Sequence, residues 1–152
     1  MRLYPPVYVV GRETVREAEI GGYRVPRGTV LFMSQWIVHR DERYFPAPLS
    51  FKPERWDDGF ARSLPRFAYF PFGGGARVCI GQPLALMEAK LVLATICQRF
   101  RLTDTHGEAI EPYASITLRP DRSIRPLVSR RPPADPAAAR DLATSTRRST
   151  RR

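Results

Sequence analysis

Residues 72–83 read Phe72-Gly73-Gly74-Gly75-Ala76-Arg77-Val78-Cys79-Ile80-Gly81-Gln82-Pro83, with a single cysteine between a glycine-rich loop and a predicted helix. Consecutive glycines allow positive φ angles and a close approach of the backbone to a flat or bulky group. Pro83 suits the first turn of a helix, which the apolar sequence from Leu84 to about Arg99 continues. The positive end of that helix would stabilise a thiolate at Cys79, and N–H groups of the turn could hydrogen-bond its sulfur.

Other interpretations of this loop fail at different points. A dinucleotide-binding fingerprint would need a glycine where Val78 stands, and a strand before the loop. A nucleophilic cysteine needs a base, but the two histidines, His39 and His106, have no local partner that would orient them. An inert, buried cysteine is a good interpretation of Cys97, which lies on the apolar helix. That interpretation does not explain the pattern around Cys79.

The composition predicts a folded chain rather than a disordered one. Of the 152 residues, 43% are hydrophobic and 11% aromatic, enough for one domain of ordinary size or a piece of a larger one. There is no run of eighteen apolar residues, which predicts no membrane-spanning helix. The first residues lack the apolar segment of a secretory signal, so we expect a cytoplasmic protein of the soluble bacterial type.

The net charge of +10 does not predict a nucleic-acid partner. Residues 130–152 hold seven Arg and two Asp, so half of the excess lies in this last segment. The segment is rich in Ala, Pro, Ser and Thr, and we predict a disordered, Arg-rich tail. The other +5 is spread over 129 residues without a basic run. An anion-binding function would rest on the tail alone.

The remaining sequence predicts an α+β fold with several β-hairpins, an irregular aromatic segment and one long buried helix. The helix is expected to be buried because it is apolar on every face. The expected elements are a hairpin around Gly21-Gly22, a strand at 29–33, a helical turn at 34–39, the irregular segment 40–72, and a second hairpin that pairs 114–118 with 124–128.

Three separate motifs resemble the cytochrome P-450 family. Phe72 to Gly81 is similar to its haem-binding signature, F-x-x-G-x-R-x-C-x-G, and matches every specified position. The sequence Phe51-Lys52-Pro53-Glu54-Arg55-Trp56 resembles the P-E-R-F motif, with Trp56 in place of Phe. Arg2-Leu3-Tyr4-Pro5-Pro6 resembles the chain after the family's E-x-x-R helix. The resemblance covers about residues 1–130.

The resemblance implies that Cys79 is both the catalytic thiolate and the axial iron ligand of haem b. Electron donation by such a thiolate favours O–O bond cleavage. Arg77 and Arg12 would bind the haem propionates. The resemblance also places Phe72, Gly73, Gly75 and Gly81 around the haem.

The resemblance further implies a structural network, a substrate surface and an electron donor. Arg2 and Arg55 correspond to two members of a Glu–Arg–Arg network. The substrate would be a lipophilic small molecule, and the expected substrate-lining residues are Val7, Val9, Val10 and Ser115. A ferredoxin- or flavodoxin-type donor would approach a cationic face, for which the candidates are Arg62, Arg66, Lys90 and Arg99.

By this resemblance residues 1–129 form the haem-binding, C-terminal part of a mainly α cytochrome P-450 domain. The network Glu and the oxygen-activating helix with its acid–threonine pair would precede residue 1, in a missing N-terminal portion of the same fold. The expected activity is a monooxygenase that oxidises a lipophilic organic substrate with reduction of molecular oxygen. We expect the 152 residues alone to be inactive. The alternative is a non-catalytic, truncated remnant of such an enzyme.

Overall fold

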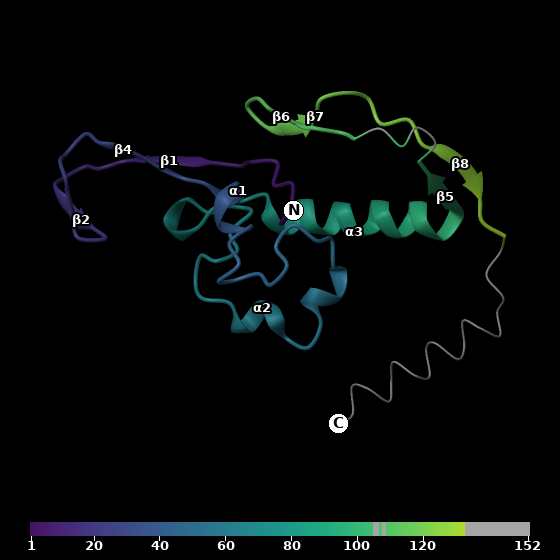
Figure 1. The fold of residues 1–152 in the computed structure, drawn as a ribbon, viewed down its shortest axis with the longest axis horizontal. Helices are drawn as coiled ribbons and strands as arrows, with labels where there is room; N and C mark the ends of the chain where they lie inside the picture. Colours follow the sequence, from purple (N-terminus) through teal and green to yellow (C-terminus); the bar gives the residue numbers. More distant parts are fainter. Residues whose placement is uncertain (105–106, 108, 133–152) are drawn as a thin grey trace. The chain divides into compact units, whose positions relative to one another are not determined.

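The computed structural model describes residues 1–104, 107 and 109–132 (Figure 1). The described chain divides into two compact units. The first unit comprises Met1–Gln82 and Ala109–Ser123, and the second comprises the described residues of 83–108 and 124–132. The first unit contains the cysteine loop, the expected network residues Arg2 and Arg55, and the expected propionate ligands Arg12 and Arg77. The second contains nearly all of the long helix.

The N-terminal part of the first unit is built from two antiparallel strand pairs. Strand β1 (Val10–Glu13) pairs with β4 (Val30–Met33), and β2 (Ala18–Ile20) pairs with β3 (Tyr23–Val25). Gly21 and Gly22 connect β2 to β3 with φ angles of 58° and 82°. Two successive positive φ angles are what a tight two-residue hairpin turn requires. The predicted hairpin at this position is confirmed.

The short helix α1 (Gln35–Val38) follows β4, as the sequence predicts. Its N-terminus is capped by Ser34, whose side-chain oxygen accepts a hydrogen bond from the N–H of Ile37 over 3.3 Å. A serine in this position satisfies one of the free N–H groups at the start of a helix.

The irregular segment 40–72 encloses the core of the first unit. It contains the short helices η1 (Pro53–Trp56) and α2 (Phe60–Ser63). Phe45 is fully buried, and its ring lies 6.1 Å from that of Phe60 and 6.4 Å from that of Trp56. Trp56 in turn lies 4.7 Å from the ring of Tyr69. Aromatic packing therefore orders a segment that has little regular backbone structure.

The predicted C-terminal hairpin is wrong. In the first unit β6 (Pro112–Ala114) pairs with β7 (Leu118–Pro120). In the second unit β5 (Phe100–Thr103) pairs with β8 (Leu127–Arg130). The turn at 120–123 therefore separates two strand pairs instead of joining the strands of one.

Helix α3 (Gln82–Arg99) confirms the predicted long helix but contradicts its predicted burial. Leu91 and Leu93 are about 60% exposed, and Cys97 is exposed as well. A helix that is apolar on every face requires protein on all sides. The described part of the chain does not supply enough structure to cover it.

Strand structure continues beyond the boundary predicted after residue 129. Strand β8 ends at Arg130, and the N–H of Arg131 donates to the carbonyl oxygen of Arg99 over 2.8 Å. Residues 133–152, the rest of the predicted tail, lie outside the described residues. Among the helices that the structure describes, none has the length and apolar character needed to cross a membrane.

Candidate functional site

Backbone hydrogen bonds give the cysteine loop its shape. The N–H of Gly73 donates to the carbonyl oxygen of Phe70 over 2.9 Å, and the N–H of Cys79 donates to that of Phe72 over 3.0 Å. Gly73 and Gly75 have φ angles of 73° and 69°, which glycine adopts without the steric cost of a side chain. The loop therefore closes on itself immediately before the cysteine.

Helix α3 begins three residues after Cys79, as predicted. The N–H of Gln82 donates to the carbonyl oxygen of Cys79 over 3.2 Å. A Cβ atom added at Gly81 would lie 3.7 Å from the Cys79 sulfur, so Gly81 borders the thiol directly. The thiol is exposed and belongs to no disulfide.

A cavity of about 560 Å³ lies beside the Cys79 thiol. It brings together seven predicted site residues from the loop, from strand β1 and from the segment before it: Phe72, Gly73, Arg77, Cys79, Val10, Arg12 and Val7. Met1, Pro6 and Pro71 also line it. Four of the predicted haem-binding and substrate-lining residues are outside its lining: Gly75, Gly81, Val9 and Ser115.

The Cys79 thiol and the two arginines in this cavity suit an anionic cofactor whose metal ion is coordinated mainly by the cofactor itself. Within the described residues there is no group of three or more His, Cys, Asp or Glu side chains that could hold a metal ion. Cys79 would therefore be a single protein ligand. Arg77 and Arg12 form no ion pair with a described carboxylate. Two available guanidinium groups beside an apolar wall fit a flat, hydrophobic group with negatively charged substituents.

The first predicted network residue, Arg2, is buried, with 6% of its surface exposed. Its guanidinium donates to the carbonyl oxygens of His39 (2.8 Å), Pro48 (2.6 Å) and Ser50 (3.1 Å). Burial lowers the pKa of Arg2, and the positive charge of Arg55 lowers it further. The backbone thus satisfies much of the hydrogen-bonding capacity of a buried cation.

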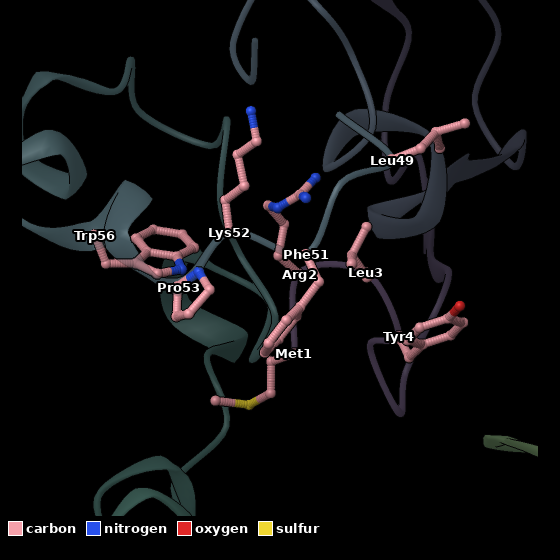
Figure 2. Close-up of a pocket in the computed structure, with 9 residues that line it drawn as sticks. All are labelled: Met1, Arg2, Leu3, Tyr4, Leu49, Phe51, Lys52, Pro53 and Trp56. Atoms are coloured by element: carbon pink, nitrogen blue, oxygen red, sulfur yellow. The ribbon is translucent and has the colours of Figure 1, made fainter. Parts of the chain in front are cut away.

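The second network residue, Arg55, lies near enough to affect Arg2 electrostatically. It donates to the carbonyl oxygen of Ala47 over 3.2 Å, while its buried Nε has no described partner. Neither arginine forms an ion pair with a carboxylate of the described chain. Figure 2 shows the neighbouring cavity of about 490 Å³, which Arg2, Phe51 and Trp56 line together with six other residues.

Tyr8 links the two stretches of chain that hold the expected substrate-lining residues. Its hydroxyl donates to the carbonyl oxygen of Ser115 over 2.9 Å, and the N–H of Leu118 donates to that of Pro6 over 2.8 Å. Ser115 thus holds the β6–β7 hairpin against the cavity-lining segment through its backbone. The contact joins positions more than 100 residues apart, so no local sequence pattern could have indicated it.

Gly74 is a further residue that sequence reasoning missed. A Cβ atom added there would lie 2.3 Å from the ring of Phe67, much closer than two carbon atoms can approach. The ring of Phe67 therefore leaves no room for a side chain at the middle glycine of the loop. The family signature leaves this position unspecified.

The four predicted donor-facing cations are all exposed. Arg62 lies on α2, and Lys90 and Arg99 lie on α3. The guanidinium of Arg66 stacks 4.8 Å from the ring centre of Phe67, beside the cysteine loop.

The chain was compared with known sequences and solved structures. It is 40% identical over 126 residues to cyclooctatin synthase of Streptomyces melanosporofaciens, covering 82% of this chain and 28% of that protein. It is 43% identical over 110 residues to cyclooctat-9-en-7-ol 5-monooxygenase of the same organism, covering 72% and 24%. The chain thus spans about a quarter of the length of these relatives.

The fold is similar to that of solved haem domains. The crystal structure of the cytochrome P-450DA heme domain aligns with a TM-score of 0.80 and 31% identity, over 87% of this chain and 29% of that one. The retinoic acid-bound cyanobacterial CYP120A1 aligns with a TM-score of 0.79 and 34% identity, over 85% and 30%. The sequence profile described as Cytochrome P-450 matches residues 1–124, and the chain therefore belongs to the cytochrome P-450 family.

Proposed function

We propose that this chain forms the thiolate-bearing haem site of a monooxygenase that oxidises a lipophilic organic substrate with molecular oxygen. One observation carries the proposal: a single thiol and two arginines without carboxylate partners meet at an otherwise largely apolar cavity. Cys79 and Arg77 occupy specified positions of the haem-binding signature, and Arg12 comes to the same cavity from strand β1.

Each side chain has a distinct task at this site. Cys79 binds the haem iron as a thiolate, and the start of α3 together with the turn N–H groups favours its negative charge. Arg77 and Arg12 bind the propionates through charge-assisted hydrogen bonds. Phe72, Val7 and Val10 exclude water from the cavity. When bound, the haem supplies the iron chemistry that activates oxygen.

The proposed substrate class follows from the apolar lining. The name of the related cyclooctat-9-en-7-ol 5-monooxygenase indicates that this relative oxidises a largely hydrocarbon alcohol, which supports a lipophilic substrate here. Val9 and Ser115 do not line the cavity, and Ser115 contacts the lining segment through the hydrogen bond that its carbonyl oxygen accepts from Tyr8.

A haem titration tests the proposal. The purified chain is titrated with haem and compared with Cys79→Ala and with Cys97→Ala, the matched control on the exposed helix. We expect saturable binding with a thiolate-type absorption spectrum for the parent and for Cys97→Ala, and a different spectrum for Cys79→Ala. The same spectrum in all three proteins would contradict the proposal.

Substrate turnover is expected of a full-length enzyme, because this chain spans about a quarter of its relatives. With haem, a redox partner and a panel of lipophilic substrates, the 152-residue chain should give no oxygenated product. Coupled turnover by the chain alone would contradict this expectation. A chain that binds haem in a thiolate-type complex but remains inactive also fits a non-catalytic remnant, whose exposed α3 surface would stay uncovered.

A further inference from the structure

Helix α1 and its C-cap residue contain three buried side-chain atoms that have no described hydrogen-bond partner. They are the side-chain Oε1 and Nε2 of Gln35 and the Nδ1 of His39. Both side chains are fully buried, with 0% of their surface exposed. Buried polar groups in folded proteins are nearly always hydrogen-bonded, so these three atoms require an explanation.

The three atoms belong to one turn of helix α1. Gln35 is the first residue of this helix and His39 is its C-cap, and the N–H of His39 donates to the carbonyl oxygen of Gln35 over 2.9 Å. Side chains four residues apart lie on the same face of a helix. The unpaired atoms of Gln35 and His39 therefore face a common region of the interior.

The other ring nitrogen of His39 determines its protonation state. Nε2 accepts a hydrogen bond from the N–H of Phe70 over 3.0 Å, so it carries no proton. Burial lowers the pKa of His39 to about 4, which keeps the ring neutral near pH 7. A neutral imidazole with an accepting Nε2 must carry its proton on Nδ1. That N–H needs an acceptor inside the protein.

We propose that one internal water molecule bridges Gln35 and His39 and fixes the Nδ1–H tautomer of His39. The water would accept from the Nδ1–H of His39 and from one N–H of the Gln35 amide, and would donate to Oε1 of Gln35. Three hydrogen bonds are the usual number for a buried water. Full burial of both side chains means that the bridging group must lie within the described core.

The proposed water has a consequence for the cysteine loop. The N–H of Phe70 donates to His39, and its carbonyl oxygen accepts from the N–H of Gly73. The bridge would thus hold Phe70 at the entrance of the loop that ends at Cys79. Gln35 becomes a positioning residue for this loop, and the inference holds whether or not haem is bound.

Nuclear magnetic resonance of the ¹⁵N-labelled 152-residue chain tests the proposal. A long-range ¹H–¹⁵N correlation of the imidazole rings should show His39 protonated on Nδ1 at neutral pH, with His39→Gln identifying its signals. The Gln35 side-chain amide should show cross-relaxation with a long-lived water. A proton on Nε2 of His39, or absence of water cross-relaxation at Gln35, would overturn the proposal.

A substitution then tests the link to the loop. Gln35→Leu removes both amide atoms at similar volume, and should increase the hydrogen-exchange rate of the Phe70 N–H about tenfold. The matched control is Gln98→Leu on the exposed surface of α3, where the rate should stay unchanged. An unchanged rate in a folded Gln35→Leu chain would contradict the positioning role.

Discussion

The backbone N–H of Cys79 donates a 3.0 Å hydrogen bond to the carbonyl oxygen of Phe72, and this contact closes the loop that presents the thiol. Six residues lie between the two partners, and three of them are glycines. The loop geometry therefore depends on backbone conformations that other residues adopt at a cost, and this dependence can be measured.

Gly75→Ala should destabilise the loop because Gly75 has a φ of 69°. An L-residue in this region costs about 1–2 kcal/mol, which denaturant unfolding of the chain can measure. Gly81→Ala is the matched control. Gly81 is outside the positive-φ region, and its added Cβ would make an ordinary 3.7 Å contact with the sulfur. Equal stability losses in the two variants would contradict this explanation of the loop.

Replacement of Arg77 or Arg12 by Met should accelerate haem loss. Each guanidinium is proposed to make a charge-assisted hydrogen bond of about 1.5–3 kcal/mol with a propionate, which corresponds to roughly a tenfold to hundredfold faster dissociation. Transfer of haem to an excess of an apoprotein acceptor measures the rate. Arg16→Met, an exposed residue outside the cavity lining, is the control and should leave the rate unchanged. If both cavity variants release haem at the parental rate, the propionate roles are wrong.

Acid should weaken the fold through His39. Its pKa is lowered to about 4 in the folded chain, mainly by burial, whereas an exposed histidine titrates near 6.5. The unfolded chain therefore binds a proton more readily as the pH falls through this window. The contribution of the neutral His39 ring to the free energy of unfolding is fully present above about pH 6.5. It decreases by on the order of 1–3 kcal/mol as the pH falls to 4.

Denaturant unfolding at a series of pH values checks this effect. The chain has two histidines, so His106→Gln serves as the control for His39→Gln. The dependence between pH 6.5 and 4 should be reduced in the His39 variant and retained in the His106 variant. If the free energy of unfolding of His39→Gln keeps the full pH dependence of the parent, other groups are responsible for it.

Electron transfer to the full-length enzyme should slow as salt is added. The exposed cations Arg62, Arg66, Lys90 and Arg99 are proposed to attract an acidic ferredoxin- or flavodoxin-type donor, and salt screens such attraction. Stopped-flow reduction at increasing ionic strength measures the rate. Charge reversal at Arg66 should weaken the salt dependence, whereas reversal at Arg24, on strand β3, should not. A rate that is insensitive to salt would count against a cationic docking face.

Local signals in the sequence predicted the local structure well. Gly21-Gly22 specifies its turn by backbone freedom, Ser34 caps α1 with its own side chain, and the apolar run after Pro83 forms α3. Each of these features depends on residues within a few positions of one another. The cysteine loop belongs to the same class, because its glycines and its hydrogen bonds lie within ten residues.

Long-range features could not be predicted in the same way. Strand β5 follows α3 directly and pairs with β8 across more than 20 residues, so the nearby turn at 120–123 gave a wrong pairing. The sequence of α3 shows that the helix is apolar, but it does not show which other segments pack against it. Its exposure could therefore not be predicted. Which residues line the cavity likewise depends on the tertiary fold, and Val10 lines it whereas Val9 does not.

The ferrous–CO absorption spectrum of the haem complex tests the central assignment most directly. A thiolate ligand shifts the main absorption band to the red, and the band reports the ligand without requiring turnover. We predict that the red-shifted band is present in the parent and in Cys97→Ser and absent in Cys79→Ser. A red-shifted band that survives Cys79→Ser and disappears in Cys97→Ser would contradict the assignment of Cys79 as the iron ligand.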